Sequence, residues 1–236
     1  MRKLFAALFF LSFLYARGQS LDSTGNLLLK SADTISNLFF ASQGESLPVY
    51  SGRVFYPYLQ IQGNAFYPSE NWQKGSILYD SVVYHDIPIL FDIYRSELLT
   101  MSPKNITVCL YSPRVQKFYF AGLSFVKLNA DSGNVIKTGF YEQLAAGKIT
   151  MLAHRKKVIS ESIANFSVEK KFVFESSYYA LKEGKYYAVH NKRSMLSLVR
   201  DNRQAVTKHL KQRGLKYKRD KEKTIVELAR FYNQSH

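Results

Sequence analysis

Residues 77–84 read Ile-Leu-Tyr-Asp-Ser-Val-Val-Tyr, and this stretch decides the fold class. Short runs of aliphatic and aromatic residues flank the turn-forming pair Asp80-Ser81, which is typical of a tight β-hairpin. The same texture runs from Val49 to about Phe174. Further strands are expected at 87–94, 97–100, 105–111, 115–120, 123–128, 138–145 and 148–153. No helical segment separates these strands, so the pattern predicts an antiparallel meander, curled or closed into a barrel-like shape, and argues against parallel β-α-β units.

The later part of this region holds one clear hairpin and one ambiguous segment. Glu183-Gly184-Lys185 separates two tyrosine-rich runs, 178–181 and 186–189, which predicts a second hairpin. Residues 154–169 fit both a helix and an extended strand, and the sequence leaves the two alternatives open.

Helices are predicted at both ends of the chain. In residues 24–41, Leu28, Ile35 and Phe39 fall on one helical face. At the C-terminal end, Ser194, Asp201 and Asp220 are candidate N-caps, Ala205, Val206, His209 and Leu210 share a face, and Gly214 is a candidate stop. The strongest periodicity is that of 221–233, where Ile225, Leu228, Ala229 and Tyr232 form one apolar stripe. The predicted class is therefore α+β, with an N-terminal helix, a β-rich middle and C-terminal basic helices.

Composition bounds the type of protein. The chain has 236 residues, of which 46% are hydrophobic and 22% charged, with one cysteine. These values exclude a disordered chain, a collagen-like fibre and a disulfide-stapled scaffold. We expect four segments: a signal peptide over 1–18, a helical segment over 19–48, a β-rich domain over 49–190 and a basic helical segment over 191–236.

The first residues have the pattern of a secretory signal peptide. Arg2 and Lys3 precede the apolar stretch 4–15, and small residues in 16–18 predict cleavage before Gln19. The apolar stretch is too short for a bilayer span, and no later run reaches span length. We therefore expect an exported, periplasmic or extracellular protein with no transmembrane segment in its mature chain.

The candidate catalytic residues form no local signature. Cys109 lies in a predicted strand and is expected to be a buried, inert thiol. Asp80, Asp86 and Asp92 recur every six residues, and paired carboxylates can hydrolyse glycosides, but turn and strand-end roles are favoured. No two histidines lie within five residues, and no zinc, phosphate-loop or cofactor pattern is present. The sequence thus indicates no catalytic residue, metal or cofactor, and favours a non-enzyme.

Aromatic residues make up 15% of the chain, with 17 Tyr and 17 Phe. They fill sheet faces well, so a core role is favoured over a ligand-binding surface. Pairs such as Tyr178-Tyr179 and Tyr186-Tyr187 nevertheless place rings on both faces of a strand. The sequence leaves open which of these rings are exposed.

Positive charge is concentrated in the last third of the chain. Residues 19–152 are neutral overall, whereas residues 153–236 hold 20 Lys and Arg against 8 Asp and Glu, a net charge of +12. Eight cations crowd residues 208–223 and form the candidate anion-binding set. They are Lys208, Lys211, Arg213, Lys216, Lys218, Arg219, Lys221 and Lys223. Such a cluster attracts anionic lipid or acidic polymer, or it is only a solvated face; the export signal makes nucleic acid an unlikely partner.

Several stretches carry a family resemblance. They are Val49-Tyr50-Ser51-Gly52-Arg53, Trp72-Gln73-Lys74-Gly75, Tyr79-Asp80-Ser81-Val82-Val83-Tyr84, Ile87-Pro88-Ile89-Leu90-Phe91-Asp92 and Gly139-Phe140-Tyr141-Glu142. With the end of the signal peptide, they resemble a family of exported Bacteroidota proteins to which no activity is assigned. Members usually have a glycine near the 80–84 turn, where this chain has Ser81. The resemblance implies a source and a compartment, and no site residues.

The favoured function is that of a non-catalytic binding or structural protein of the bacterial cell envelope or exterior. Its partner would be another protein or an anionic envelope component. Two alternatives remain: an envelope-polymer hydrolase whose site is assembled from distant residues, and an adaptor that binds anionic surfaces through residues 208–223.

Overall fold

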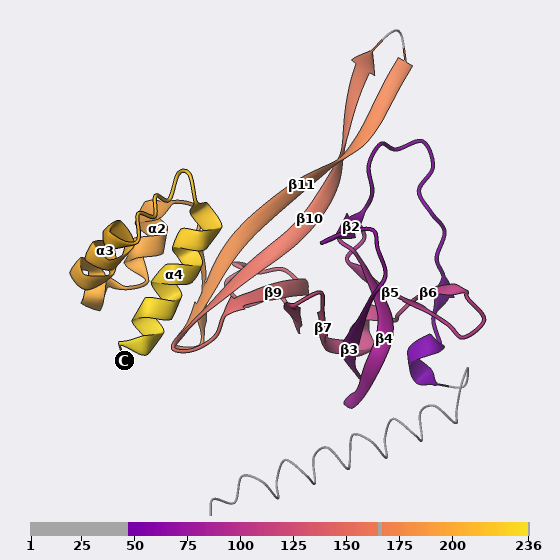
Figure 1. The fold of residues 1–236 in the computed structure, drawn as a ribbon, viewed down its shortest axis with the longest axis horizontal. Helices are drawn as coiled ribbons and strands as arrows, with labels where there is room; N and C mark the ends of the chain where they lie inside the picture. The colour runs from indigo at the N-terminus through magenta and orange to yellow at the C-terminus, as the bar shows by residue number, and fades with distance from the viewer. Residues whose placement is uncertain (1–46, 165–166, 236) are drawn as a thin grey trace, which may run out of the picture. The chain divides into compact units, whose positions relative to one another are not determined.

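The computed structural model describes residues 47–164 and 167–235, which belong to one compact unit. The predicted signal peptide, the predicted helix over 24–41 and nearly all of the 19–48 segment lie outside the described residues. The described part is built on one antiparallel sheet of 12 strands, followed by three helices (Figure 1). The bounds of the strands are β1 Arg53–Val54, β2 Phe66–Tyr67, β3 Gln73–Tyr79, β4 Val82–Asp92, β5 Glu97–Met101, β6 Thr107–Cys109, β7 Val115–Phe120, β8 Leu123–Leu128, β9 Gly139–Ala145, β10 Ile149–Ala164, β11 Ser167–Lys182 and β12 Lys185–Ala188.

The strand order confirms the predicted antiparallel meander and shows that the sheet is not closed into a barrel. Neighbours run β1-β6-β5-β4-β3-β7-β8-β9-β10-β11-β12, and β2 pairs with β4 off this path. Strands consecutive in the chain mostly pair with each other, as short hairpin connections dictate. The end strands β1 and β12 do not pair, so the sheet is open and a barrel-like closure is wrong. Short alternating strands specify hairpins, but they carry no information about whether the two edges meet.

The hairpin at 77–84 has the predicted turn. Asp80 and Ser81 both have positive φ, 49° and 66°, and Tyr79 pairs with Val82 across them. This left-handed pair matches the twist of a two-residue hairpin. The separate strand expected at 87–94 is instead the second half of β4, which runs unbroken from Val82 to Asp92. The strand contains a bulge at His85 and Asp86, where Asp86 has φ 54°. The bulge interrupts the alternation of side chains, which is why the sequence pattern predicts two strands where the structure has one.

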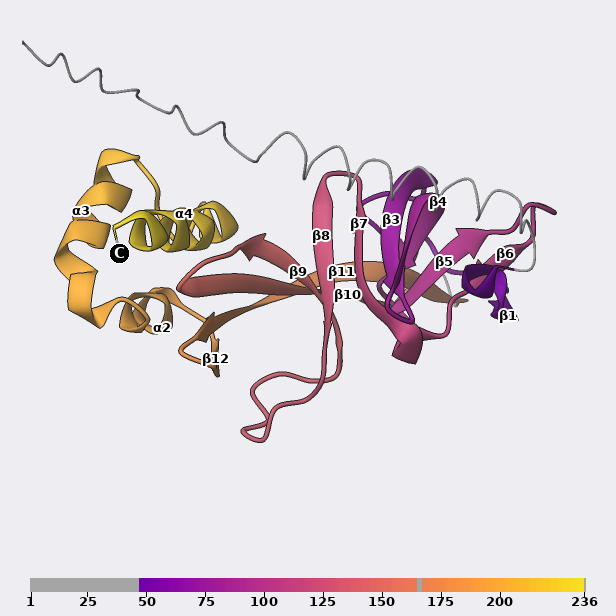
Figure 2. The same ribbon diagram turned by 90° about the horizontal axis from the view of Figure 1, so that it is seen from below.

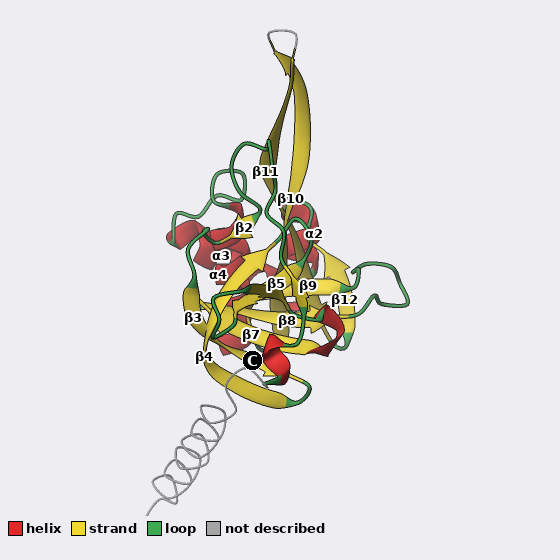
Figure 3. Ribbon diagram, turned by 90° about the vertical axis from the view of Figure 1, so that its right-hand side faces the viewer, coloured by secondary structure: helices red, strands yellow, loops and turns green. Residues whose placement is uncertain are grey.

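The ambiguous segment 154–169 is strand on both sides of the undescribed residues 165 and 166. β10 and β11 pair along their whole length, from Ile149 with Lys182 to Ala164 with Ser167. Their outer part projects beyond the neighbouring strands as a two-stranded arm (Figure 3). Cross-strand ion pairs stabilise the arm, with Lys156 Nζ 2.8 Å from Glu175 and Lys170 Nζ 2.9 Å from Glu161.

A cluster of five phenylalanine rings lies in the core of the sheet. The buried rings meet edge-to-face, tilted or stacked, with centroids 4.8–6.0 Å apart; they are Phe91, Phe118, Phe120, Phe125 and Phe140. This geometry adds to the stabilisation from burial. Other rings lie on the surface, Tyr56, Tyr111 and Tyr119 among them. The core interpretation therefore holds for these phenylalanines but not for every aromatic.

Three helices follow the sheet and gather at its β9–β12 end (Figure 2). They are α2 (Lys192–Ser197), α3 (Arg203–Gln212) and α4 (Lys221–Gln234). The predicted stripe on α4 is confirmed: its four residues are buried in one apolar cluster with Ile149, Met151 and Ala180 of the sheet. These helices confirm the C-terminal helical part of the predicted class.

The predicted helix caps are partly wrong. The N-cap of α2 is Asn191, whose side chain accepts the Ser194 N–H at 2.9 Å, while Ser194 Oγ accepts the Asn191 N–H at 3.1 Å. Ser194 is thus the third residue of this capping box. Asp201 instead accepts the Tyr232 hydroxyl at 2.8 Å, and Asp220 accepts from Arg219 Nε at 2.9 Å, so neither side chain caps a helix. Asp201 has a distant partner that local spacing does not reveal. Asp220 does occupy the N-cap position of α4, but its side chain bonds the adjacent Arg219 and not the helix backbone.

The end of α3 follows the prediction more closely. Val206 and Leu210 are buried and His209 is half-buried, but Ala205, expected on the same face, is exposed. Gly214 has φ 66° and stops the helix, the left-handed conformation that glycine adopts without strain.

Candidate functional site

The eight predicted cations lie on α3, on the connection 213–220 and on the first turn of α4. All are exposed except Lys221, which is half-buried with its Nζ 4.8 Å from the Tyr178 ring centroid. Arg213 and Arg219 are engaged by neighbouring carboxylates, with their Nε atoms 3.2 Å from Glu227 and 2.9 Å from Asp220. The side-chain ammonium groups of the remaining five have no hydrogen-bond or ion-pair partner among residues 47–164 and 167–235. They are Lys208, Lys211, Lys216, Lys218 and Lys223.

Three of these lysines converge on a hollow between α2, α3 and the connection that follows α3. We call this hollow the helical-end cavity; its volume is about 790 Å³. Lys211, Lys216 and Lys218 line it, together with Lys192 and Arg193 from α2. The described lining residues include no Asp or Glu, so the cavity is an uncompensated positive site.

Beneath this basic rim the cavity is apolar. Met195, Leu196 and Leu210 are buried, and Leu215 and Tyr217 are half-buried beside them. Methionine and leucine side chains at these positions complete the apolar cluster that holds the helices on the sheet. The cavity therefore combines an apolar interior with a cationic mouth, the arrangement of a site for a ligand with an apolar body and an anionic end.

One polar group inside this region lacks a partner. The Tyr217 hydroxyl is shut off from solvent, and no described residue bonds it. Burial raises the pKa of Tyr217, so the hydroxyl is a neutral donor. A buried hydroxyl donor without an acceptor among the described residues costs stability.

Arg213 and Lys223 line a different hollow, of about 430 Å³, together with Glu222 and Glu227. Here carboxylates stand beside the cations, and Glu227 is bonded by His209 at 2.7 Å as well as by Arg213. Arg230 also lines this hollow, so three cations stand beside two carboxylates and much of the positive charge is offset. This hollow is therefore a weaker site for an anion than the helical-end cavity. The structure thus separates the three lysines that line the helical-end cavity from Arg213 and Arg219, which are paired with carboxylates. The other three predicted cations, Lys208, Lys221 and Lys223, do not line that cavity.

A buried ion network fixes α4 on the sheet. Arg155 of β10 donates from Nε to Glu142 of β9 and from a terminal nitrogen to Glu222 of α4, both at 2.6 Å. Tyr178 donates to the same Glu222 oxygen at 2.8 Å. Burial alone would raise the pKa of Glu222, but the hydrogen bonds and charge of Arg155 outweigh it and hold this pKa below its usual range. Both carboxylates bond the guanidinium, so the network positions α4 on the sheet.

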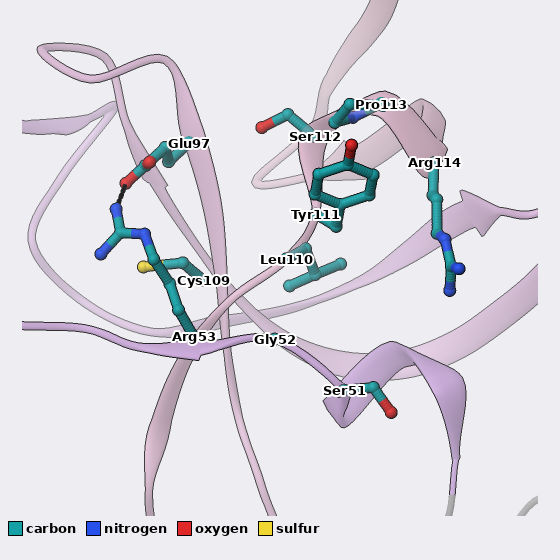
Figure 4. A pocket seen from close by; sticks show the side chains of 10 residues that line it. All are labelled: Ser51, Gly52, Arg53, Glu97, Cys109, Leu110, Tyr111, Ser112, Pro113 and Arg114. Carbon is teal, nitrogen blue, oxygen red and sulfur yellow. Dashed lines mark hydrogen bonds and ion pairs between the residues drawn. The ribbon is translucent and has the colours of Figure 1, made fainter.

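Cys109 lines a separate hollow of about 540 Å³ near β1 and β6, shown in Figure 4. The thiol is nevertheless 2% exposed, and burial raises its pKa to about 11, with the charge of Glu97 adding to the effect and Arg53 opposing it. Arg53 is bonded to Glu97, and Arg114 lies 3.4 Å from Asp80. The cations of this hollow are therefore compensated. The predicted burial of Cys109 is confirmed, and a thiol with this pKa is not a nucleophile near neutral pH.

The three aspartates that recur every six residues do not converge. Asp80 lies in the turn before β4 and Asp92 at its far end, roughly 35 Å away along the strand. Glycoside hydrolysis requires two carboxyl groups within about 10 Å. Asp92 is fully buried and accepts the N–H groups of Tyr94 and Arg95 at 2.8 and 2.9 Å, a structural role.

The described histidines also lie apart from one another. His85 Nδ1 is 3.0 Å from Ser76 Oγ, His154 stacks on Tyr141, and His209 stacks on Phe231. Within residues 47–164 and 167–235, no group of three or more His, Cys, Asp or Glu is placed to hold a metal ion.

Comparison with known proteins gives no match: no family model fits the sequence, and no curated protein or solved structure is significantly similar to it. None of the described helices is long and apolar enough to cross a membrane. Sequence reasoning found three cations of the helical-end cavity but missed Lys192 and Arg193. These two precede the basic cluster by about 15 residues, and the packing of α2, α3 and the connection after Gly214 around one hollow brings the two groups together.

Proposed function

We propose that this protein is a non-catalytic binding protein of the bacterial envelope or exterior, and that its helical end binds the anionic headgroups of lipids. The observation that carries the proposal is the helical-end cavity, where five cations from two separate segments surround an apolar interior with no acidic residue among the described lining. A cluster that served solubility alone would need neither convergence nor an apolar interior.

The charge distribution supports the same function. The +12 net charge of residues 153–236 creates a field that attracts anionic surfaces, while the neutral 19–152 segment adds no opposing net charge. Lysines contribute about 1 kcal/mol each next to an anionic leaflet, so three to five convergent cations suffice for a measurable affinity.

The remainder of the described structure acts as a support in this proposal. The buried Arg155 network and the apolar stripe of α4 hold the helices on the β9–β12 end of the sheet. A site on packed elements keeps its cations in place, which lowers the entropy cost of binding.

Export is part of the proposal and rests on the sequence. Arg2, Lys3 and the apolar stretch 4–15 have the form of a signal peptide, and the resemblance to exported Bacteroidota proteins agrees with it. Protein recovered outside the cytoplasm should begin at Gln19 or within two residues of it. Recovery there with an intact Met1 would contradict cleavage.

Vesicle binding tests the function. The purified protein is titrated with phosphatidylglycerol vesicles and with phosphatidylcholine vesicles, at about 0.02 and 0.15 M salt. We expect binding to the anionic vesicles alone, weakening as salt rises. The variant Lys211→Gln/Lys216→Gln/Lys218→Gln should lose most of it.

The matched control removes three exposed lysines from the sheet region, as Lys74→Gln/Lys117→Gln/Lys137→Gln. Both variants lower the net charge by the same amount, so a difference between them reports position. Equal losses in the two variants, or no binding even at low salt, would refute the proposal.

A further inference from the structure

We propose that the helical-end cavity binds a single-chain anionic amphiphile, a fatty carboxylate or an alkyl phosphate, with the chain inside and the anion at the rim. This inference rests on the proposed function and names the ligand class of the same site. A headgroup held at the surface needs only the lysines, whereas the cavity behind them is large and apolar.

The interior matches an alkyl chain in size and chemistry. Its volume of about 790 Å³ lies within the range of small-molecule sites, about 300–1,000 Å³. Met195 and Leu210 face it from two helices, and Leu215 and Tyr217 complete the wall from the connection. An acidic polysaccharide or a phosphate ion alone would leave this apolar wall without a partner.

The rim selects the sign of the ligand's charge and not the shape of its headgroup. Four of the five rim cations arise from α2 and the 213–220 connection, and four of the five are lysines. The lysine ammonium is a point charge, while arginine presents the planar fork that recognises oxyanions in a bidentate manner. Carboxylate and phosphate headgroups should therefore both bind, and a neutral sugar headgroup should bind much more weakly.

Chain length provides the decisive measurement. The purified protein is titrated by calorimetry with octyl, decyl and dodecyl phosphate, each below its micelle concentration, with decanoate as the carboxylate arm and decyl maltoside as the neutral arm. If the chain enters the cavity, affinity should rise about fourfold for each added methylene. An affinity that does not change with chain length would overturn the inference.

Two tryptophan substitutions on α3 locate the chain. Thr207 is exposed and lines the cavity, so Thr207→Trp places an indole in the space that the chain would occupy. Ala205 is exposed on the same helix and does not line the cavity, so Ala205→Trp is the matched control. We expect at least a tenfold loss of decyl phosphate affinity in the first variant, and parental affinity in the second. Parental affinity in Thr207→Trp would contradict the inference.

The vesicle and amphiphile titrations together separate this inference from the proposed function. If anionic vesicles bind through Lys211, Lys216 and Lys218 but alkyl phosphates show no dependence on chain length, the cavity does not take the chain and the surface function stands. If alkyl phosphates bind with the chain-length dependence but vesicles do not, the ligand is a free amphiphile and the membrane part of the proposed function fails. If neither binds, both are refuted.

Discussion

Replacing Leu228 by alanine tests whether α4 is an integral part of the fold. Leu228 has no exposed surface and belongs to the apolar cluster that joins α4 to Ile149, Met151 and Ala180 of the sheet. The change removes three buried carbons, a transfer loss of about 2.4 kcal/mol, and the cavity left behind brings the total to about 2–5 kcal/mol. For a chain of this length, about 3 kcal/mol corresponds to a fall in melting temperature of roughly 6–12 °C.

Thermal unfolding followed by circular dichroism measures the effect. The matched control is Leu59→Ala, because Leu59 is 79% exposed and its truncation leaves no cavity. We expect a change within about 0.5 kcal/mol for this control. If Leu228→Ala melts within about 2 °C of the parent, α4 contributes little to the cooperative fold, and the account of a helix fixed by its apolar stripe is wrong.

Three further predictions concern single groups. The Cys109 thiol should react slowly with a thiol reagent in the folded protein and rapidly in denaturant, because burial raises its pKa to about 11; fast labelling of the folded protein would contradict this. Tyr217→Phe should leave the free energy of unfolding unchanged or raise it by about 1 kcal/mol, since the buried hydroxyl has no partner in the described structure, whereas Tyr232→Phe should lower it by about 1 kcal/mol because that hydroxyl donates to Asp201. The folded pKa of Glu222 lies below its ordinary value of 4.5, so its contribution to stability is present above that pH and is lost as pH falls through the folded pKa. The melting temperature of the parent should accordingly fall more steeply than that of Glu222→Gln between pH 5 and 3, and parallel curves would refute the assignment.

The parts of the fold that the sequence predicted are those in which neighbouring residues decide the structure. The turn at Asp80-Ser81 needs two left-handed residues between strand formers, and the α4 stripe needs only a repeat of three and four. The sequence leaves the secondary structure of the arm open because neither of its strands has a clear periodic pattern. The strands stabilise each other across the hairpin, through pairs such as Lys156 with Glu175. The predicted cap at Asp201 is wrong for a similar reason: its carboxylate accepts the hydroxyl of Tyr232, 31 residues away.

The basic cluster shows why a correct compositional prediction was still too coarse for the site. The sequence treats the eight cations of 208–223 as equivalent, because each lies within a few residues of the next. In the structure, Arg213 and Arg219 are compensated by Glu227 and Asp220, whereas three lysines join Lys192 and Arg193 around the cavity. An ion pair removes most of a cation's attraction for a distant anion. The net charge of residues 208–223 therefore overestimates the attraction for an anion near the paired arginines and underestimates it at the cavity.

The choice of ligand depends on this division. Had all eight cations remained uncompensated along one exposed face, a long acidic polymer would match them best, since such a partner needs only a line of charge. Instead three of the uncompensated lysines line an apolar cavity, and the apolar wall adds a second requirement that a polymer of sugars does not meet. An amphiphile satisfies both the charge of the rim and the chemistry of the interior, so the dependence of affinity on chain length is the measurement that distinguishes these two kinds of partner.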